Sequence, residues 1–205
     1  MILYKTIAAE AEAATEIERS RFLAHISPAA TREEAEAYLD DLRRRYRDAT
    51  HNVPAMVIGE HSELQWASDD GEPQGTAGAP MLQVLLGAGL TNVVLVVTRW
   101  FGGIKLGTGG LVRAYTGAAR AVLEEAEVRA VREICELTVR LDYGAAARLP
   151  HLASQGLFAI AGSRYEEAVT AVLHCEKEDA PRLRQLLADL AAGEEKIVSE
   201  VFKKS

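Results

Sequence analysis

The most constraining feature of this chain is an apolar strand pattern that leads through a glycine-dense loop into a helix pattern. Residues 92–98 have the composition of a buried strand, and the triplet Arg99-Trp-Phe follows them directly. Glycine is favoured where φ must be positive or where another molecule approaches the backbone closely. We therefore expect a surface formed by main-chain atoms, and we place the functional site there. Five of the nine residues after the triplet are glycines: Gly102, Gly103, Gly107, Gly109 and Gly110.

Length and composition limit the class of protein. A chain of 205 residues can bury one large core or two small ones. No run of about 18 apolar residues occurs, and the N-terminus lacks the pattern of a signal peptide. The two cysteines, Cys135 and Cys175, are too few for a disulfide framework and lack zinc-site spacing. These observations predict a cytoplasmic protein with no membrane-spanning segment.

Charge is patterned around the glycines. The net charge of −7 argues against a uniformly basic surface for nucleic acid. Residues 99–120 nevertheless contain four basic residues and no acidic one, whereas Asp69, Asp70 and Glu72 place three carboxylates within four residues. The sequence is therefore compatible with a local basic patch on an acidic protein.

The first 130 residues show strand and helix patterns. Thr31 and Glu34 form a capping box that opens an amphipathic helix over residues 31–47. Thr108 is placed to N-cap a long helix that reaches about residue 127. Another helix is expected after Thr76, reaching about residue 86. Strands are expected at residues 20–27, 52–59, 64–67 and 92–98.

Beyond residue 130 the pattern changes, and we place a boundary there between domains 1–130 and 131–205. The order β-α-β-β-α-β in about seventy residues predicts a ferredoxin-like domain and an α+β class overall. In this topology the first and third strands are neighbours, so Cys135 and Cys175 either lie close together or are two separate buried thiols. Strands are expected at 135–141, 157–165, 168–176 and 196–202, with helices at 145–154 and from Asp179 to Gly193.

Two long motifs carry a family resemblance. Ser68-Asp-Asp-Gly-Glu-Pro-Gln-Gly-Thr-Ala-Gly-Ala-Pro80 and Arg99-Trp-Phe-Gly-Gly-Ile-Lys-Leu-Gly-Thr-Gly-Gly-Leu-Val-Arg-Ala-Tyr115 resemble the IMPACT/YigZ family. Ser20-Arg-Phe and Asp48-Ala-Thr-His support the resemblance. It covers roughly residues 1–130, and the remainder resembles the small domain attached to bacterial members.

The resemblance implies a specific pair of folds. The N-terminal domain would be like the second domain of small-subunit ribosomal protein five, a fold shared with elongation factor G domain IV. The C-terminal domain would be like elongation factor G domain V. Eukaryotic IMPACT proteins modulate translational control through an additional N-terminal domain, for which this chain has no room. That role is therefore not transferred here.

The segment 99–113 favours an anion-binding site. Main-chain amides at a helix N-terminus can hold a phosphate, and Arg99, Lys105 and Arg113 add positive charge. The segment matches neither the P-loop nor the Gly-x-Gly-x-x-Gly pattern. The alternative is that its glycines only permit a tight crossing of helix and sheet. The predicted anion- or nucleic-acid-binding residues are Arg99, Trp100, Gly102, Gly103, Lys105, Gly107, Thr108, Gly109 and Arg113.

The acidic loop has three interpretations. Asp69, Asp70 and Glu72 could coordinate Mg²⁺ through water, or they could cap a turn. They could also pair with Arg99 or Arg113 and hold the two glycine-rich segments together. We assign no metal ligand and no cofactor. The loop residues expected to contact the ligand are Asp69, Asp70, Glu72, Gly75, Thr76 and Gly78.

His51 could act as a general base oriented by Asp69 or Asp70. Ser20 or Ser68 could then serve as a nucleophile, although the chain has no Gly-x-Ser-x-Gly elbow. The alternative is a structural histidine with satisfied hydrogen bonds.

These readings lead to two main hypotheses. The first is a non-enzymatic protein that binds RNA or the ribosome and modulates translation, with Trp100 or Phe101 stacking on a base. The rival is an enzyme acting on a phosphorylated small molecule or nucleotide, with the glycine loop as phosphate site and His51, Asp69 and Asp70 as catalytic residues. A deep pocket containing all three favours the enzyme, and an open basic face favours RNA. A third option is protein binding through the C-terminal sheet.

Overall fold

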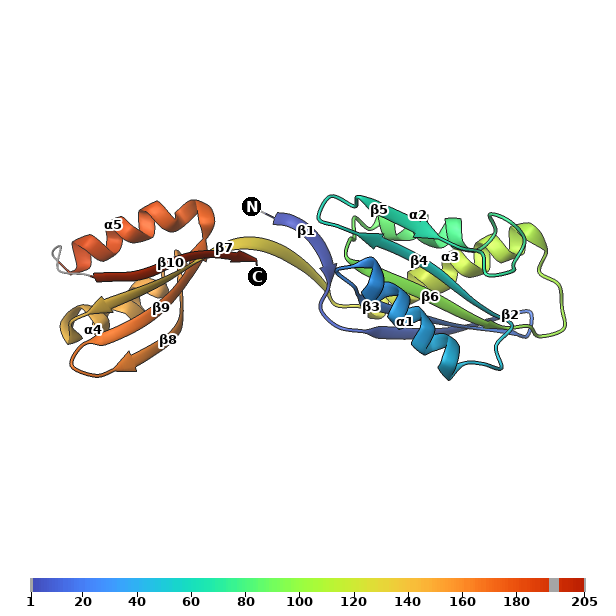
Figure 1. Ribbon diagram of the computed structural model, residues 1–205, viewed down its shortest axis with the longest axis horizontal. Helices are drawn as coiled ribbons and strands as arrows, with labels where there is room; N and C mark the ends of the chain where they lie inside the picture. Colours follow the sequence, from blue (N-terminus) through green and yellow to red (C-terminus); the bar gives the residue numbers. More distant parts are fainter. Residues whose placement is uncertain (1, 192–195, 205) are drawn as a thin grey trace. The chain divides into compact units, whose positions relative to one another are not determined.

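The computed structural model describes residues 2–191 and 196–204, which form two compact units (Figure 1). One unit is Tyr4–Ala130, and the other contains the chain from Val131 onward together with Ile2 and Leu3. Each combines a β-sheet with helices, so the predicted α+β class is confirmed. No helix of the described residues is both long enough and apolar enough to cross a membrane.

A five-stranded antiparallel sheet is the centre of the unit Tyr4–Ala130. The strand β6 lies in its middle and is buried over seven of its eight residues, as its apolar composition predicts. All four strands expected in this region are present, but two more precede them: β2 at the sheet edge and β1 (Ile2–Ile7). In order across the sheet the strands are β2 (Ala11–Ile17), β3 (Ser20–Pro28), β6 (Val93–Trp100), β4 (His51–Ile58) and β5 (Leu64–Ala67).

Helices cover both faces of this sheet (Figure 1). The helices α2 (Gly78–Gly87) and α3 (Gly107–Glu125) pack on one face, where Met81 and Tyr115 join the larger apolar core. The helix α1 (Arg32–Arg45) packs on the other face through Leu39 and Leu42. Strands β4 and β6 are therefore apolar on both faces, which accounts for their continuous apolar runs.

The helix starts differ in part from the sequence-based expectations. Thr31 Oγ1 accepts the Glu34 N–H at 3.2 Å, but the Glu34 carboxylate accepts the N–H of Ala30 at 2.7 Å and not that of Thr31. The expected N-cap role of Thr108 is wrong. The helix α3 begins at Gly107, with Leu106 at the cap position and no side-chain cap. Within the described residues, its first-turn N–H groups therefore have no side-chain cap.

The second unit has the predicted ferredoxin-like topology. Its strand order β8-β9-β7-β10 places the first and third strands of the motif side by side in the centre, and β1 also pairs with β7. The expected helix stop at Gly193 lies outside the described residues. The elements are β7 (Val128–Leu141), α4 (Tyr143–Ala153), β8 (Ala159–Tyr165), β9 (Val169–Glu176), a 3₁₀ turn at Lys177–Asp179, α5 (Ala180–Leu190) and β10 (Lys196–Lys204).

The two cysteines face each other in this sheet. Cys135 of β7 is directly opposite Cys175 of β9, and both are buried, free thiols in the core beneath α4 and α5. Burial raises the pKa of the Cys135 thiol, and the neighbouring Glu200 carboxylate adds to the effect. Burial, with the nearby Cys135, raises the pKa of Cys175 to about 12. The thiolate, which is the reactive form, is therefore suppressed at both positions.

We expect both thiols to resist iodoacetamide at about pH 8 in the folded protein and to react fully after unfolding. Stability should also fall as the pH rises from about 9 towards 12, because the thiols of the unfolded chain lose protons there while those of the folded chain keep them. Mass spectrometry of the labelled protein and urea unfolding at several pH values measure the two effects. Rapid labelling of the native protein would contradict the assignment.

Candidate functional site

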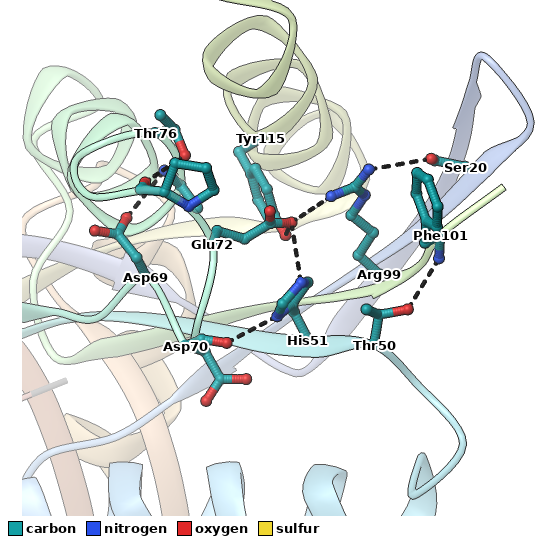
Figure 2. A network of polar contacts seen from close by, with 12 residues as sticks. Ser20, Thr50, His51, Asp69, Asp70, Glu72, Thr76, Arg99, Phe101 and Tyr115 are labelled. Carbon is teal, nitrogen blue, oxygen red and sulfur yellow. Dashed lines mark hydrogen bonds and ion pairs between the residues drawn. The ribbon is translucent and has the colours of Figure 1, made fainter. Parts of the chain in front are cut away.

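The candidate site lies at the end of β6, where four segments meet. The sheet register places His51, the first residue of β4, opposite Arg99 near the end of β6. The loop at 68–77 connects β5 to α2, and the loop at 101–106 connects β6 to α3. Figure 2 shows the polar side chains of these segments converging on Glu72. Two regions separated in sequence by β6 and α2 thus form one site.

A buried ion pair joins the acidic loop to the sheet. Arg99 Nη1 donates to Glu72 Oε1 at 2.6 Å, and the two side chains are only 6% and 4% exposed. The hydroxyl of Tyr115, from the third turn of α3, donates to the same oxygen at 2.7 Å. Burial and this hydrogen bond raise the pKa of Tyr115 well above its ordinary value. Glu72 therefore connects the loop, the sheet and the helix α3.

Arg99 is held on every side. Its Nη2 donates to Ser20 Oγ at 3.3 Å, and its guanidinium carbon lies 5.4 Å from the ring centre of Phe22 and 5.5 Å from that of Phe101. Its Nε is buried without a hydrogen-bond partner among the described residues. The predicted charge at position 99 thus belongs to the protein interior, where Glu72 compensates it, and is not a free surface cation.

Asp69 caps the loop that leads into α2. Its carboxylate accepts backbone N–H groups from Gly75 (2.7 Å), Ala77 (3.0 Å) and Gly78 (2.9 Å). Partial burial opposes ionisation of this carboxyl, but the three donors outweigh it and lower its pKa below the ordinary value. The carboxylate is therefore an internal acceptor for the loop backbone.

Asp70 ties the same loop to α1 and β4. One carboxylate oxygen accepts the Asn52 N–H at 2.7 Å, and the other accepts Arg43 Nη2 at 2.8 Å. Its carbonyl oxygen lies 2.8 Å from His51 Nδ1. Because a carbonyl only accepts, Nδ1 carries the proton of the neutral ring, and Nε2 is left as an acceptor. The nearest acidic oxygen to Nε2, Glu72 Oε1, is 3.8 Å away.

The three interpretations of the acidic loop can now be separated. Turn capping holds for Asp69, and ion pairing holds for Glu72 with Arg99. Asp70 forms an ion pair that was not expected, with Arg43 at the end of α1. In the described part of the chain no three His, Cys, Asp or Glu side chains are grouped so that they could hold a metal ion.

Two glycines explain how closely the segments approach. A Cβ at Gly102 would lie 2.1 Å from the carbonyl carbon and oxygen of Arg19, and one at Gly78 would lie 2.5 Å from the carbonyl oxygen of Ser68. Both are far below any real contact, so glycine is required at Gly102 for the approach to the β2–β3 turn and at Gly78 for the approach to Ser68. Gly103 and Gly107 instead have positive φ and open space around them.

Of the remaining predicted residues, one has a side chain held in place by the protein and the others are exposed to solvent. Trp100 donates its indole N–H to Asp48 at 2.9 Å and has the guanidinium of Arg21 5.0 Å from its ring centre, so its position is fixed. Phe101 is 44% exposed. Exposed residues at the start of α3 and in the loop before it are Gly103, Lys105, Gly107, Thr108, Gly109 and Arg113.

A pocket of about 480 Å³ lies beside the ion pair. Phe101, Leu106 and Leu111 supply apolar walls, while His51 and Lys105 are among the polar lining residues. The start of α3, at Gly107 and Thr108, also borders it. When the His51 ring is neutral, its Nε2 contributes an acceptor to a pocket that Arg99 and Lys105 also line with donors. The Glu72 carboxylate in the same pocket is compensated by Arg99.

Several residues of the site were not predicted to have a role in it. Tyr115 is the last residue of the second long motif, and a polar-tipped aromatic on a helix face of small residues was the available signal. Thr50, whose Oγ1 accepts the Phe101 N–H at 3.0 Å, lies in the Asp48-Ala-Thr-His motif, but its chemistry alone did not indicate this contact. Ser20 and Ser68, considered as nucleophiles, both accept backbone hydrogen bonds, from Gly102 and Asp70 at 3.2 Å each.

Replacing Glu72 by alanine should lower the free energy of unfolding by roughly 3 to 5 kcal/mol, because Arg99 would stay buried without a counter-charge. Gln74→Ala, an exposed change in the same loop, is the matched control and should act within about 0.5 kcal/mol. Urea unfolding measures both. Equal midpoints for the two variants would show that the ion pair is not required.

Gly102→Ala should destabilise the protein by roughly 1 to 3 kcal/mol, because the new methyl group overlaps the backbone at Arg19. The control is Gly117→Ala, in the middle of α3 with no atom within 4 Å of the added carbon. It should stabilise the helix by up to about 1 kcal/mol. Thermal unfolding of the pair distinguishes a steric effect from a general intolerance of glycine replacement.

Comparisons with known proteins agree with the resemblance seen in the two motifs. A family model described as the Impact N-terminal domain matches residues 18–123, and one described as a domain of unknown function (DUF1949) matches residues 139–194. A solved structure described as that of an hypothetical protein has a TM-score of 0.61 and 32% identity, and the match covers 96% of both chains.

Two curated relatives match over most of their length. IMPACT family member YvyE of Bacillus subtilis (strain 168) is 35% identical over 194 residues, which are 95% of this chain and 89% of YvyE. IMPACT family member YigZ of Escherichia coli (strain K12) is 34% identical over 180 residues, which are 87% of this chain and 88% of YigZ. The chain therefore belongs to the IMPACT family.

Proposed function

We propose that this protein binds RNA, on its own or on the ribosome, and modulates translation without catalysing a reaction. The observation that carries the proposal is a group of exposed cations around the end of β6 and the start of α3. They form no ion pair within the described part of the chain, so their charge is available to a ligand. These residues, called the basic rim below, are Arg19, Arg47, Lys105 and Arg113.

Contacts within the unit bring the basic rim together. Arg19, in the turn between β2 and β3, touches the backbone of Gly102 just before Lys105. Arg47 directly precedes Asp48, which holds the indole of Trp100. Arg113 lies one turn into α3, and a Cβ added at Gly109 would be 3.6 Å from its guanidinium. Several cations around the same end of the sheet suit a polyanion better than they suit a single small anion.

Other basic residues nearby are less available. In the cluster at the end of α1, Arg44 and Arg45 pair with Asp41, and Arg43 pairs with Asp70. Phosphate contacts by these three would compete with existing ion pairs. The rim cations have no such competitor, and the α3 N-terminus beside them offers N–H groups that no side chain caps. This supports a phosphate-binding face centred on the α3 start.

The proposed role in translation is based on family membership and not on the site itself. The chain belongs to the IMPACT family, and its two-domain α+β organisation agrees with the likeness to domains IV and V of elongation factor G inferred from the motifs. Likeness of fold is an association and not a mechanism. The role in translation is therefore proposed together with RNA binding, and the same experiment addresses both.

The rival proposal, an enzyme for a phosphorylated metabolite, receives less support. It needs Asp69 and Asp70 beside His51 as orienting or metal-binding carboxylates. Both carboxylates accept hydrogen bonds from the loop and strand backbone, and neither lines the pocket that contains His51. The acid nearest His51 is Glu72, whose charge Arg99 compensates.

We expect the protein to co-sediment with ribosomal subunits, with an affinity that falls steeply as salt rises. The double variant Lys105→Ala/Arg113→Ala should bind more weakly. The slope of log affinity against log salt concentration should also become less negative by about 1.4 to 1.8, which is the value for two lost phosphate contacts. Sedimentation across a salt series measures both quantities.

The matched control is Lys5→Ala/Arg129→Ala, which removes one lysine and one arginine from exposed positions of the same unit. Lys5 bridges to Leu90, near the opposite end of β6. This variant should co-sediment like the wild type. If the wild type shows no association at low salt, or if the two double variants lose equal affinity, the proposal is wrong.

A further inference from the structure

We propose that the pocket beside the buried ion pair holds one unstacked nucleotide of a single-stranded RNA. The base would lie against Phe101, the phosphate beside Lys105 and the first turn of α3, and the ribose 2′-hydroxyl on His51 Nε2. This inference rests on the proposed function, since it names the ligand group that the same face of the molecule takes. It adds a claim that the basic rim alone does not make, namely that the site distinguishes RNA from DNA.

The pocket has the size and lining of a small-molecule site. Its volume of about 480 Å³ falls within the range of roughly 300 to 1,000 Å³ found for such sites. Leu106, Leu111 and Pro73 supply apolar walls, and most of the surface that lines the pocket is apolar. A base needs such apolar walls, whereas a backbone phosphate alone does not. This composition therefore favours a whole nucleotide over inorganic phosphate.

Phe101 is placed and held for stacking. It is 44% exposed, although it lies only two residues after the buried Arg99 in sequence. Its backbone N–H donates to Thr50 Oγ1 at 3.0 Å, and the guanidinium carbon of Arg99 lies 5.5 Å from its ring centre (Figure 2). A ring fixed before binding loses little freedom when a base stacks on it. Trp100 cannot take this role, because its hydrogen bond to Asp48 holds its ring away from the pocket.

Donors for the phosphate border the same pocket. Lys105 is exposed and has no ion pair within the described residues. Gly107 and Thr108 open the 19-residue helix α3, whose first turn has no side-chain cap. The carboxylate of Glu72 also lines the pocket, but Arg99 Nη1 and the Tyr115 hydroxyl both donate to it. The local charge available to a ligand is therefore positive.

His51 supplies the discriminating group. Its Nδ1–H is committed to the Asp70 carbonyl at 2.8 Å, so Nε2 of the neutral ring is an acceptor. Glu72 Oε1, 3.8 Å away, is itself an acceptor and cannot satisfy it. A hydroxyl donor suits this position, and in a nucleotide the 2′-hydroxyl of ribose provides one. Deoxyribose has no group that could replace it.

The test is a fluorescence anisotropy titration of the full chain with a short labelled oligouridylate and with the oligodeoxyuridylate of the same length. The base and phosphate count are then equal, and only the 2′-hydroxyl differs. We expect the ribo-oligomer to bind about fivefold more tightly, the value of one net hydrogen bond. The control Lys5→Ala/Arg129→Ala should keep this preference.

Two substitutions separate the parts of the pocket. His51→Asn keeps a donor for the Asp70 carbonyl but has no acceptor at the position of Nε2, so the two oligomers should bind equally. Phe101→Ala should weaken both oligomers by about tenfold, and Phe101→Trp, which keeps a ring, should not. Unfolding midpoints of the variants show whether each one is folded under the conditions of the titration.

Each outcome of the titration supports or overturns a specific part of the inference. Equal affinity of the wild type for the two oligomers would overturn the inference, while salt-dependent binding of both would leave the proposed function standing. A ribose preference that survives His51→Asn would overturn the role of His51. If neither oligomer binds, the pocket does not hold a single-stranded ribonucleotide, and co-sedimentation with ribosomal subunits then decides the proposed function separately.

Discussion

The buried pair of Arg99 and Glu72 is the interaction on which the site depends. Two charges inside a protein are tolerated only when each is compensated and hydrogen-bonded. Here Ser20 and Tyr115 complete the arrangement, so a strand end, a loop and a helix must all be in place together. The pair therefore positions the pocket, although neither residue offers a free charge to a ligand.

How much of this follows from sequence depends on the range of the interactions. The helices and the central strands are indicated by local sequence patterns, and the unbroken apolar run of β6 predicts a buried strand. The edge strand β2 consists largely of alanine and glutamate and has no such signal, because its place is fixed by pairing with β3 across a two-residue turn at Glu18 and Arg19. The helix start at Gly107 reflects backbone geometry that the cap preference of Thr108 does not override.

The site itself was predictable as a region but not in its chemistry. The two glycine-rich motifs mark where the segments meet, and ion pairing between them was one of the expected alternatives. Which carboxylate pairs with Arg99 is a question of three-dimensional register: Asp69 and Asp70 point to backbone groups on either side, and Glu72 alone reaches the arginine. The spacing of these residues in the sequence does not determine which of them pairs with Arg99. The tautomer of His51 is likewise not predictable from sequence, because it depends on the carbonyl of Asp70 in a different loop.

The proposed nucleic-acid site is compatible with an acidic protein, because salt limits the range over which charges interact. At physiological ionic strength the screening length is about 8 Å, so a phosphate at the basic rim feels mainly the charges within the first contacts. Most of the acidic residues that give the net charge of −7 lie elsewhere or are already paired, as Asp41, Asp70 and Glu72 are. At low salt the remaining negative charge acts over a longer range and opposes approach to RNA in other orientations. The overall charge would then favour approach through the basic rim, so net acidity would add to the selectivity of the proposed RNA site.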